Sequence, residues 1–223
     1  MNNITEMSNV KQAEFFDATN KPRVHIIGCG SVGSTLADLI ARAGFKKIDL
    51  WDSDEIEPKN VVNSMLSSTD VGRLKTDVVK QMIEAINPAA EVRTHGWYKG
   101  ELLNGIVLLA VDKIDVRRDF VNKNIYNPNV KCVGDFRTML KSAQHFFARW
   151  DNKEEIKGLK ESMNFDSSEC ETEVSACGIT LGVAPTVRII CAYGVANLIN
   201  YLKTSDCKRL IVADAFNFEV DAM

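Results

Sequence analysis

The segment Gly28-Cys29-Gly30-Ser31-Val32-Gly33 constrains the fold of this chain more than any other feature. An apolar run at residues 24–27 precedes it, and a helical apolar periodicity follows it as far as residue 43. In this order of strand, loop and helix, the first glycine permits a sharp turn, the second lets a phosphate approach the backbone, and the third lets the helix pack on the strand. The segment therefore predicts a nucleotide-binding loop at the positive end of a helix, and the alternative is a bare tight turn.

The hydrophobic pattern predicts that strands and helices alternate along the rest of the chain. We expect a Rossmann-like, doubly wound α/β fold with a mixed sheet, preceded by an arm at residues 1–21 and forming one domain over residues 22–223. The expected strands are 23–27, 47–51, 91–94, 106–111, 130–133, 139–149 and 209–218. The expected helices are 31–43, a helix from Asp70 as its cap to residue 86, 116–125 and 186–202, with an exposed crossover loop at 151–173.

Charge and composition exclude several classes of protein. The 223 residues carry a net charge of −3, so no basic field predicts a nucleic-acid partner. The longest apolar run, residues 106–111, is too short to cross a membrane, and the polar N-terminus resembles no export signal, so we expect a cytoplasmic protein. The six cysteines form no C-x-x-C pair, which argues against zinc and against a disulfide framework, and Cys29, Cys132 and Cys191 are expected in the core.

An acidic residue ends the second expected strand. Asp52 lies 24 positions after Gly28, close to the spacing of about 20 at which a carboxylate binds ribose hydroxyls in such folds. Two carboxylate oxygens suit the two hydroxyls of a ribose. The alternative is a solvated turn residue, because Asp52 belongs to a small acidic cluster with Asp54, Glu55 and Glu57.

Further motifs follow the glycine loop in a fixed order. They are Trp51–Asn60, Asp70-Val71-Gly72-Arg73-Leu74-Lys75, Ile86-Asn87-Pro88, Val111-Asp112-Lys113, Gly134-Asp135-Phe136-Arg137, Ser175-Ala176-Cys177-Gly178 and Gly182-Val183-Ala184-Pro185. Together they resemble the adenylating domain of the ThiF, MoeB and ubiquitin-activating enzyme superfamily, over about residues 22–218. The resemblance implies a ThiF/MoeB-type domain with antiparallel C-terminal strands.

The resemblance also implies an activity. Enzymes of this superfamily bind ATP and Mg²⁺ and adenylate a carboxylate, usually the C-terminus of a small ubiquitin-like or sulfur-carrier protein or a peptide, with release of pyrophosphate. They are usually homodimers. The expected partner is therefore a small acceptor with a free C-terminal carboxylate, and neither nucleic acid nor a membrane is expected.

Individual site residues are carried over from matching positions. The positions assigned to the nucleotide are Gly28, Gly30, Ser31, Val32, Gly33, Asp52, Asp54, Asn60, Asn63 and Lys75. Lys75 matches the lysine that contacts the phosphates, and Asp112 matches the aspartate that holds Mg²⁺ and is needed for adenylation. The alternatives are a solvated lysine for Lys75, a helix cap for Asp112 and a turn residue for Asn60.

Cys177 matches a cysteine that forms a thioester or persulfide in some sulfur-carrier-activating relatives. A reactive thiol needs exposure and a lowered pKa. The nearby Glu171 and Glu173 are anionic and oppose thiolate formation, so an incidental or structural Cys177 remains the alternative.

Two cations of the family are missing. Asn63 stands where relatives carry a phosphate-binding arginine, and residues 1–22 contain no arginine to reach a partner subunit's site. A neutral amide binds phosphate about half as strongly as a charged donor does. Either Arg23, Lys21, Lys11 or Arg73 compensates, or activity is reduced, altered or lost. The family's zinc-binding cysteine pairs are absent as well.

Three functions fit these observations. The ordered set of glycine loop, Asp52, Lys75 and Asp112 favours an ATP-dependent adenylyltransferase. A non-catalytic nucleotide-binding protein would explain the missing arginines. An NAD(P)-dependent oxidoreductase would explain the loop and Asp52 but leaves Lys75 and Asp112 without a role.

Overall fold

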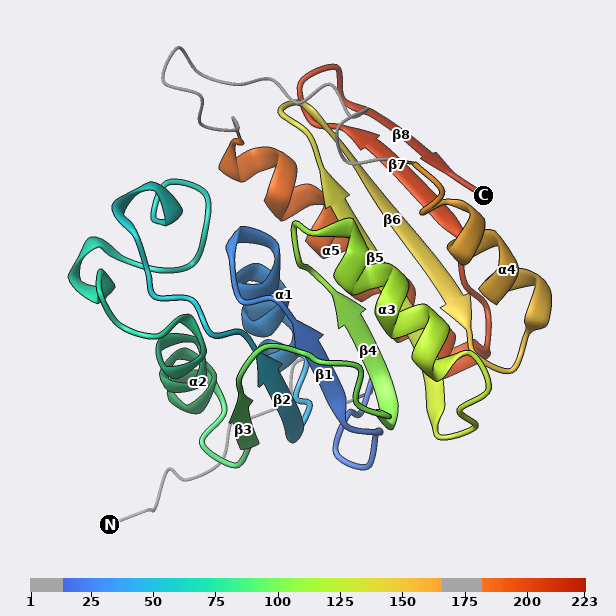
Figure 1. Cartoon of the computed structure of the whole chain (residues 1–223), viewed down its shortest axis with the longest axis horizontal. Helices are drawn as coiled ribbons and strands as arrows, with labels where there is room; N and C mark the ends of the chain where they lie inside the picture. Colours follow the sequence, from blue (N-terminus) through green and yellow to red (C-terminus); the bar gives the residue numbers. More distant parts are fainter. Residues whose placement is uncertain (1–13, 166–181) are drawn as a thin grey trace.

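A computed structural model describes residues 14–165 and 182–223, and the structural statements below concern these residues. Their core is one eight-stranded sheet with the order β3-β2-β1-β4-β5-β6-β7-β8 (Figure 1). The strands are β1 (Val24–Ile27), β2 (Lys47–Trp51), β3 (Glu91–His95), β4 (Gly105–Leu109), β5 (Val130–Thr138), β6 (Ser142–Arg149), β7 (Leu210–Asp214) and β8 (Glu219–Ala222).

The sheet is mixed, as the sequence predicts. Strands β3, β2, β1, β4 and β5 are parallel neighbours, whereas β6, β7 and β8 run antiparallel. Ile27 at the end of β1 pairs with Trp51 of β2 and with Leu109 of β4. The three carboxyl ends therefore coincide, and the segments that follow them meet at one edge of the sheet, where ligands bind in such folds.

Helices cover both faces of the sheet. The helices are α1 (Ser31–Arg42), α2 (Lys75–Ile86), α3 (Ile114–Asn124), α4 (Lys153–Glu161) and α5 (Ala184–Thr204), with short 3₁₀ turns η1 (Pro58–Asn60) and η2 (Ser68–Asp70). Helices α1, α2 and α5 pack on one face, and α3 and α4 pack on the other (Figure 1). Strand β4 shows why: Ile106 and Leu108 join the first core cluster, whereas Val107 and Leu109 join the second, because successive side chains point to opposite faces.

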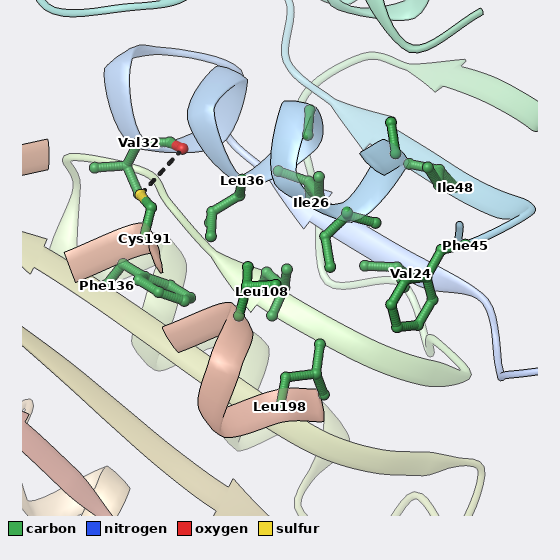
Figure 2. Packing of buried hydrophobic residues seen from close by; sticks show 14 of the residues in the cluster. Val24, Ile26, Val32, Leu36, Phe45, Ile48, Leu108, Phe136, Cys191 and Leu198 are labelled. Carbon is green, nitrogen blue, oxygen red and sulfur yellow. Dashed lines mark hydrogen bonds between the residues drawn. The ribbon is translucent and has the colours of Figure 1, made fainter. Parts of the chain in front are cut away.

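Helix α5 packs directly against α1 and β5. Figure 2 shows Cys191 of α5 beside α1, where its Sγ lies 3.7 Å from the carbonyl oxygen of Val32. Gly194 allows a similar approach to β5, because a Cβ at this position would collide with the Phe136 ring. The expectation that Cys29, Cys132 and Cys191 are core residues is confirmed, since all three are fully buried.

Part of the predicted crossover loop is helical, which corrects the interpretation of residues 151–173 as exposed loop throughout. Helix α4 begins after Asn152, whose Oδ1 accepts hydrogen bonds from the N–H groups of Glu154 and Glu155. Only Ile156 and Leu159 supply buried apolar side chains. Two apolar residues in a charged stretch give a weak periodic signal, so the sequence pattern missed this helix.

Further boundaries differ from the prediction. The expected last strand, 209–218, is β7 and the turn after it, in which Asp214 Oδ1 accepts the N–H groups of Phe216 and Asn217, and a further strand, β8, follows this turn. Asp70 does not cap α2: its Oδ2 accepts the Ser67 N–H and closes η2, and α2 begins at Lys75. No helix within the described residues is long and apolar enough to span a membrane.

Candidate functional site

The glycine loop joins β1 to α1, and its three glycines have different surroundings. Gly28 has φ +95°, and a Cβ there would lie 2.8 Å from the Ala110 carbonyl oxygen. A Cβ on Gly33 would collide with the carbonyl oxygen of Gly28. Around Gly30, in contrast, no described atom lies within 4 Å of the position of a Cβ. Packing thus requires Gly28 and Gly33, while Gly30 faces open space.

The first turn of α1 presents unpaired N–H groups beside this space. The first hydrogen bond of the helix runs from the Ser34 N–H to the Gly30 carbonyl at 2.9 Å, so the N–H groups of Ser31, Val32 and Gly33 have no acceptor within the helix. The first turn contains no acidic residue. The loop therefore offers an anion both donors and the positive end of a helix dipole.

Asp52 holds the loop in place from the end of β2. One carboxylate oxygen accepts the Cys29 N–H at 2.8 Å, and the other accepts the Asp54 N–H at 2.8 Å. The side chain is buried rather than solvated, so Asp52 is not the solvated turn residue considered above. Each oxygen keeps a further lone pair, so these bonds leave the predicted contact with ribose open.

Lys75 lies in the same place, at the first residue of α2. Its Nζ lies 2.8 Å from Asp54 Oδ2, and its N–H donates to the Asp54 carbonyl at 3.0 Å. Only 10% of the Lys75 side chain is exposed, against 48% of the Asp54 side chain. Lys75 is therefore a buried, ion-paired lysine and not a solvated one.

A small cavity of about 270 Å³ lies beside Asp52. Its other lining residues are Ser53, Leu74, Thr76, Asp77, Thr94, His95 and Gly96. A larger cavity of about 570 Å³ lies among Val130, Trp150 and α4. Because Val130 begins β5, that cavity lies at the opposite edge of the sheet from the glycine loop, whereas the smaller cavity lies at the same edge as the loop.

Asp112 lies just beyond β4 and is exposed. It does not cap the following helix, because Lys113 is the N-cap residue of α3, so the cap considered in the sequence analysis is wrong. Asp135 and Arg137, which belong to a motif but were given no role, lie beside Arg117 of α3. In the structure they form a buried ionic cluster behind Asp112, in which Asp135 pairs with Arg117 and, at 2.6 Å, with Arg137.

The Arg117 guanidinium connects this cluster to the backbone next to Asp112. Its Nε donates to the Val111 carbonyl at 3.0 Å, and its Nη2 donates to the Phe136 carbonyl at 2.9 Å. Burial lowers the pKa of Arg117 to about 9, with a smaller contribution from Arg137, while Asp112 acts in the opposite direction. The cluster thus fixes the backbone from which the Asp112 carboxylate projects.

Asn60 and Asn63 lie on the connection between β2 and α2. The Asn60 Oδ1 accepts the Glu57 N–H at 2.9 Å, which is the geometry of a turn residue. A Cβ on Gly182 would lie 2.8 Å from the Asn63 Nδ2, so Asn63 faces the beginning of α5. The same connection is bound to α1, because Ser34 Oγ accepts the Met65 N–H at 3.0 Å.

The cations proposed as substitutes for the missing arginines lie elsewhere or are paired. Arg23 precedes β1, at the edge away from the glycine loop, and pairs with Asp49 at 2.5 Å. Lys21 donates to the Leu202 carbonyl near the end of α5, and Arg73 pairs with Asp70. Lys11 and Cys177 lie outside the described residues.

A cation that the sequence analysis missed is Arg188 on α5. Its Nη2 donates to the Ser64 carbonyl at 2.9 Å, next to Asn63, and its Nη1 contacts Thr35 of α1. It lies in an apolar helix and belongs to none of the motifs, so only the packing of α5 against α1 reveals its position.

Comparisons with known proteins identify relatives of this chain. A family model described as the ThiF family matches residues 2–223. Among curated proteins, ubiquitin-like modifier-activating enzyme 5 of Drosophila ananassae is 28% identical over 94 residues, 42% of this chain and 23% of that protein. The Drosophila melanogaster enzyme is 34% identical over 74 residues, 33% of this chain and 18% of that protein. The matched parts are thus about a fifth of these relatives.

Solved structures share the fold over a larger part of the chain. E. coli MccB with ATP has a TM-score of 0.71 and 18% identity, covering 92% of this chain and 64% of that one. PaaA has a TM-score of 0.70 and 16% identity, covering 91% of this chain and 63% of that one. At these identities the similarity establishes the fold, including its antiparallel C-terminal strands.

Proposed function

The chain belongs to the ThiF family, and we propose that it uses ATP to adenylate a carboxylate. The acceptor is the C-terminus of a small ubiquitin-like or sulfur-carrier protein or of a peptide. An oxygen of that carboxylate attacks the α-phosphorus of ATP, the bond from this phosphorus to the bridging oxygen breaks, and pyrophosphate leaves. An acyl-adenylate remains.

The observation that carries this proposal is the open approach to Gly30 between two glycines that packing requires. A side chain at Gly30 would meet nothing in the described structure, so packing does not explain a glycine there, and we propose that the close approach of a ligand does. The phosphates would bind the free N–H groups of Ser31, Val32 and Gly33. We call the loop that carries these N–H groups the phosphate cradle. Asp52 holds this loop in place by accepting a hydrogen bond from the Cys29 N–H, and we propose that the remaining lone pairs of its carboxylate bind the ribose.

Lys75 supplies positive charge close to the cradle. Negative charge develops on the phosphates as pyrophosphate leaves, and a preorganised cation in a partly buried site stabilises it. Asp54 holds the Lys75 ammonium at 2.8 Å and thereby positions it. We propose supporting contacts with the nucleotide for Asn60 and Asn63, which lie on the neighbouring connection.

Asp112 fits a Mg²⁺ ion bound together with the phosphates. Within the described residues no group of three or more His, Cys, Asp or Glu side chains could hold a metal. Mg²⁺ in phosphoryl-transfer sites commonly takes one or two carboxylates and completes its shell with phosphates and water. One exposed carboxylate on a backbone fixed by Arg117 meets that need. When bound, Mg²⁺ would neutralise charge on the triphosphate.

Two parts of the proposal rest on the family resemblance alone. We propose that the protein acts as a homodimer, and that Cys177 takes part in covalent chemistry with the activated acyl group. A mild alkylating agent that labels Cys177, with labelling lost when an acceptor is activated, would support the second of these.

The central test is pyrophosphate release with ATP, Mg²⁺ and peptides that carry either a free or an amidated C-terminus. We expect release only with the free carboxylate. Asp112→Ala should lower the rate at least about 100-fold, as the loss of a transition-state contact does, and should leave the melting temperature unchanged because Asp112 is exposed.

Asp115→Ala is the matched control, because Asp115 is an 88% exposed aspartate three residues further along the chain and pairs with Arg118. It should retain full activity. Wild-type activity in Asp112→Ala would overturn the proposed mechanism. ATP binding without pyrophosphate release from any acceptor would instead favour the non-catalytic nucleotide-binding protein.

A further inference from the structure

Arg188 links α5 to α1 and to the connection between β2 and α2, the two elements that border the proposed phosphate-binding loop. It is the fifth residue of α5 and is half-buried. Besides its bond to the Ser64 carbonyl, it contacts the Thr35 hydroxyl, which itself donates to the Ser31 carbonyl at 2.8 Å. Ser31 belongs to the glycine loop. A single residue, Thr35, therefore links the guanidinium to the glycine loop.

The charge of Arg188 is not matched by any described carboxylate within ion-pair distance, unlike that of the other cations around the site. Lys75 pairs with Asp54, Arg73 with Asp70 and Arg117 with Asp135. A guanidinium has five N–H donors, and the two contacts of Arg188 use two of them. A half-buried arginine with spare donors and no anionic partner is suited to bind an anion.

We propose that Arg188 binds the outer phosphates of ATP and supplies the positive charge that Asn63 lacks. This inference rests on the proposed function. Ser64, the residue that Arg188 contacts, directly follows Asn63, so the guanidinium reaches the same part of the site from a different element. The planar guanidinium of an arginine can donate two parallel hydrogen bonds to two phosphate oxygens, whereas the side-chain amide of an asparagine has a single NH₂ donor group.

A purely structural role would have different consequences. Arg188 also holds residue 64 near α1, where Ser34 and Met65 make a second link. If that were its only role, its loss would disturb the loop as a whole, and binding of every adenine nucleotide would weaken equally. Contact with the outer phosphates predicts that only nucleotides with these phosphates lose affinity.

The experiment compares the dissociation constants of ATP and AMP for the wild type, Arg188→Gln and Arg188→Lys by calorimetry in the presence of Mg²⁺. We expect Arg188→Gln to weaken ATP binding by about tenfold or more, as loss of a charge-assisted hydrogen bond does, with AMP binding unchanged. Arg188→Lys keeps the charge without the fork and should lose about threefold. Arg93→Gln, an exposed arginine on β3 paired with Glu91, is the matched control and should change neither constant.

The deciding quantity is the ratio of the dissociation constants of AMP and ATP. If this ratio in the folded Arg188→Gln protein lies within about twofold of the wild-type ratio, the inference is overturned and the proposed function stays intact. If Arg188→Gln fails to fold, the same criterion applies to Arg188→Lys. A wild-type protein that binds neither nucleotide would overturn both the inference and the proposed function.

Discussion

At the scale of single residues, the three glycines of the loop have three different surroundings. Gly28 adopts a left-handed φ of +95°, Gly33 brings α1 against the loop, and Gly30 leaves an approach open. The sequence motif predicted these three roles. It did not predict that Asp52 binds the loop itself, through the Cys29 N–H, because that bond depends on how β2 ends beside β1.

Alanine substitutions should separate these roles. Gly33→Ala forces a Cβ into the Gly28 carbonyl and should destabilise the fold by at least about 1–3 kcal/mol. Gly30→Ala has room for a Cβ, and only its ψ of −146° lies outside the main regions for alanine, so it should cost less stability than Gly33→Ala while ATP binding weakens by about tenfold or more. Thermal unfolding and calorimetry measure the two effects. Equal losses of stability in both variants would contradict this assignment.

At the scale of elements, the contact between α5 and the antiparallel part of the sheet buries a titratable group. His145 of β6 is fully buried, stacks on Phe136 with ring centroids 4.4 Å apart, and lies 3.4 Å from Asn197 Nδ2 of α5. Burial lowers its pKa to about 3. His145 is therefore neutral in the folded protein at pH values where it is protonated in the unfolded chain.

This difference predicts how stability depends on pH. The folded pKa lies below the unfolded value of 6.5, so the contribution of His145 is complete above about pH 6.5 and is lost as pH falls towards 3. Urea unfolding of the wild type and of His145→Gln should show their difference in unfolding free energy shrinking by up to about 1.4 kcal/mol per pH unit on acidification. Parallel stability curves would show that His145 does not cause the effect.

Prediction of the elements succeeded where the apolar pattern was strong. The strands and helices from β1 to α3 were placed within a few residues, because a continuous apolar run or a 3.6-residue period is a local property. Helix α4 was missed because its stability comes from the Asn152 cap and from burial of two side chains against the sheet. The β7–β8 turn depends similarly on hydrogen bonds to Asp214.

At the scale of the whole molecule, the order of the parallel strands assembles the candidate site. Because β1 lies between β2 and β4, the glycine loop comes between Asp52 and the segment that carries Asp112. Arg23 and the larger cavity lie at the opposite edge of the sheet. The candidate site is therefore confined to one edge of the sheet.

Ligand-dependent stability follows from this arrangement. A ligand that binds only the folded chain raises its unfolding free energy by about 2.7 kcal/mol at a concentration of 100 times its dissociation constant. We expect ATP with Mg²⁺ to raise the melting temperature in differential scanning fluorimetry and NAD at the same concentration to leave it unchanged. Protection by NAD but not by ATP would favour the oxidoreductase alternative.

The sequence by itself determined the loop, the alternation of strands and helices and the motifs of the family, because each of these depends on residues that are near one another along the chain. Only the tertiary structure decided which partners the charged side chains bind. Lys75 pairs with Asp54 across 21 positions, and Arg188 donates to the Ser64 carbonyl across 124. The physical reason is that a charged side chain binds the polar groups that pack against it, and those neighbours are set by the strand order and by the approach of α5 to α1.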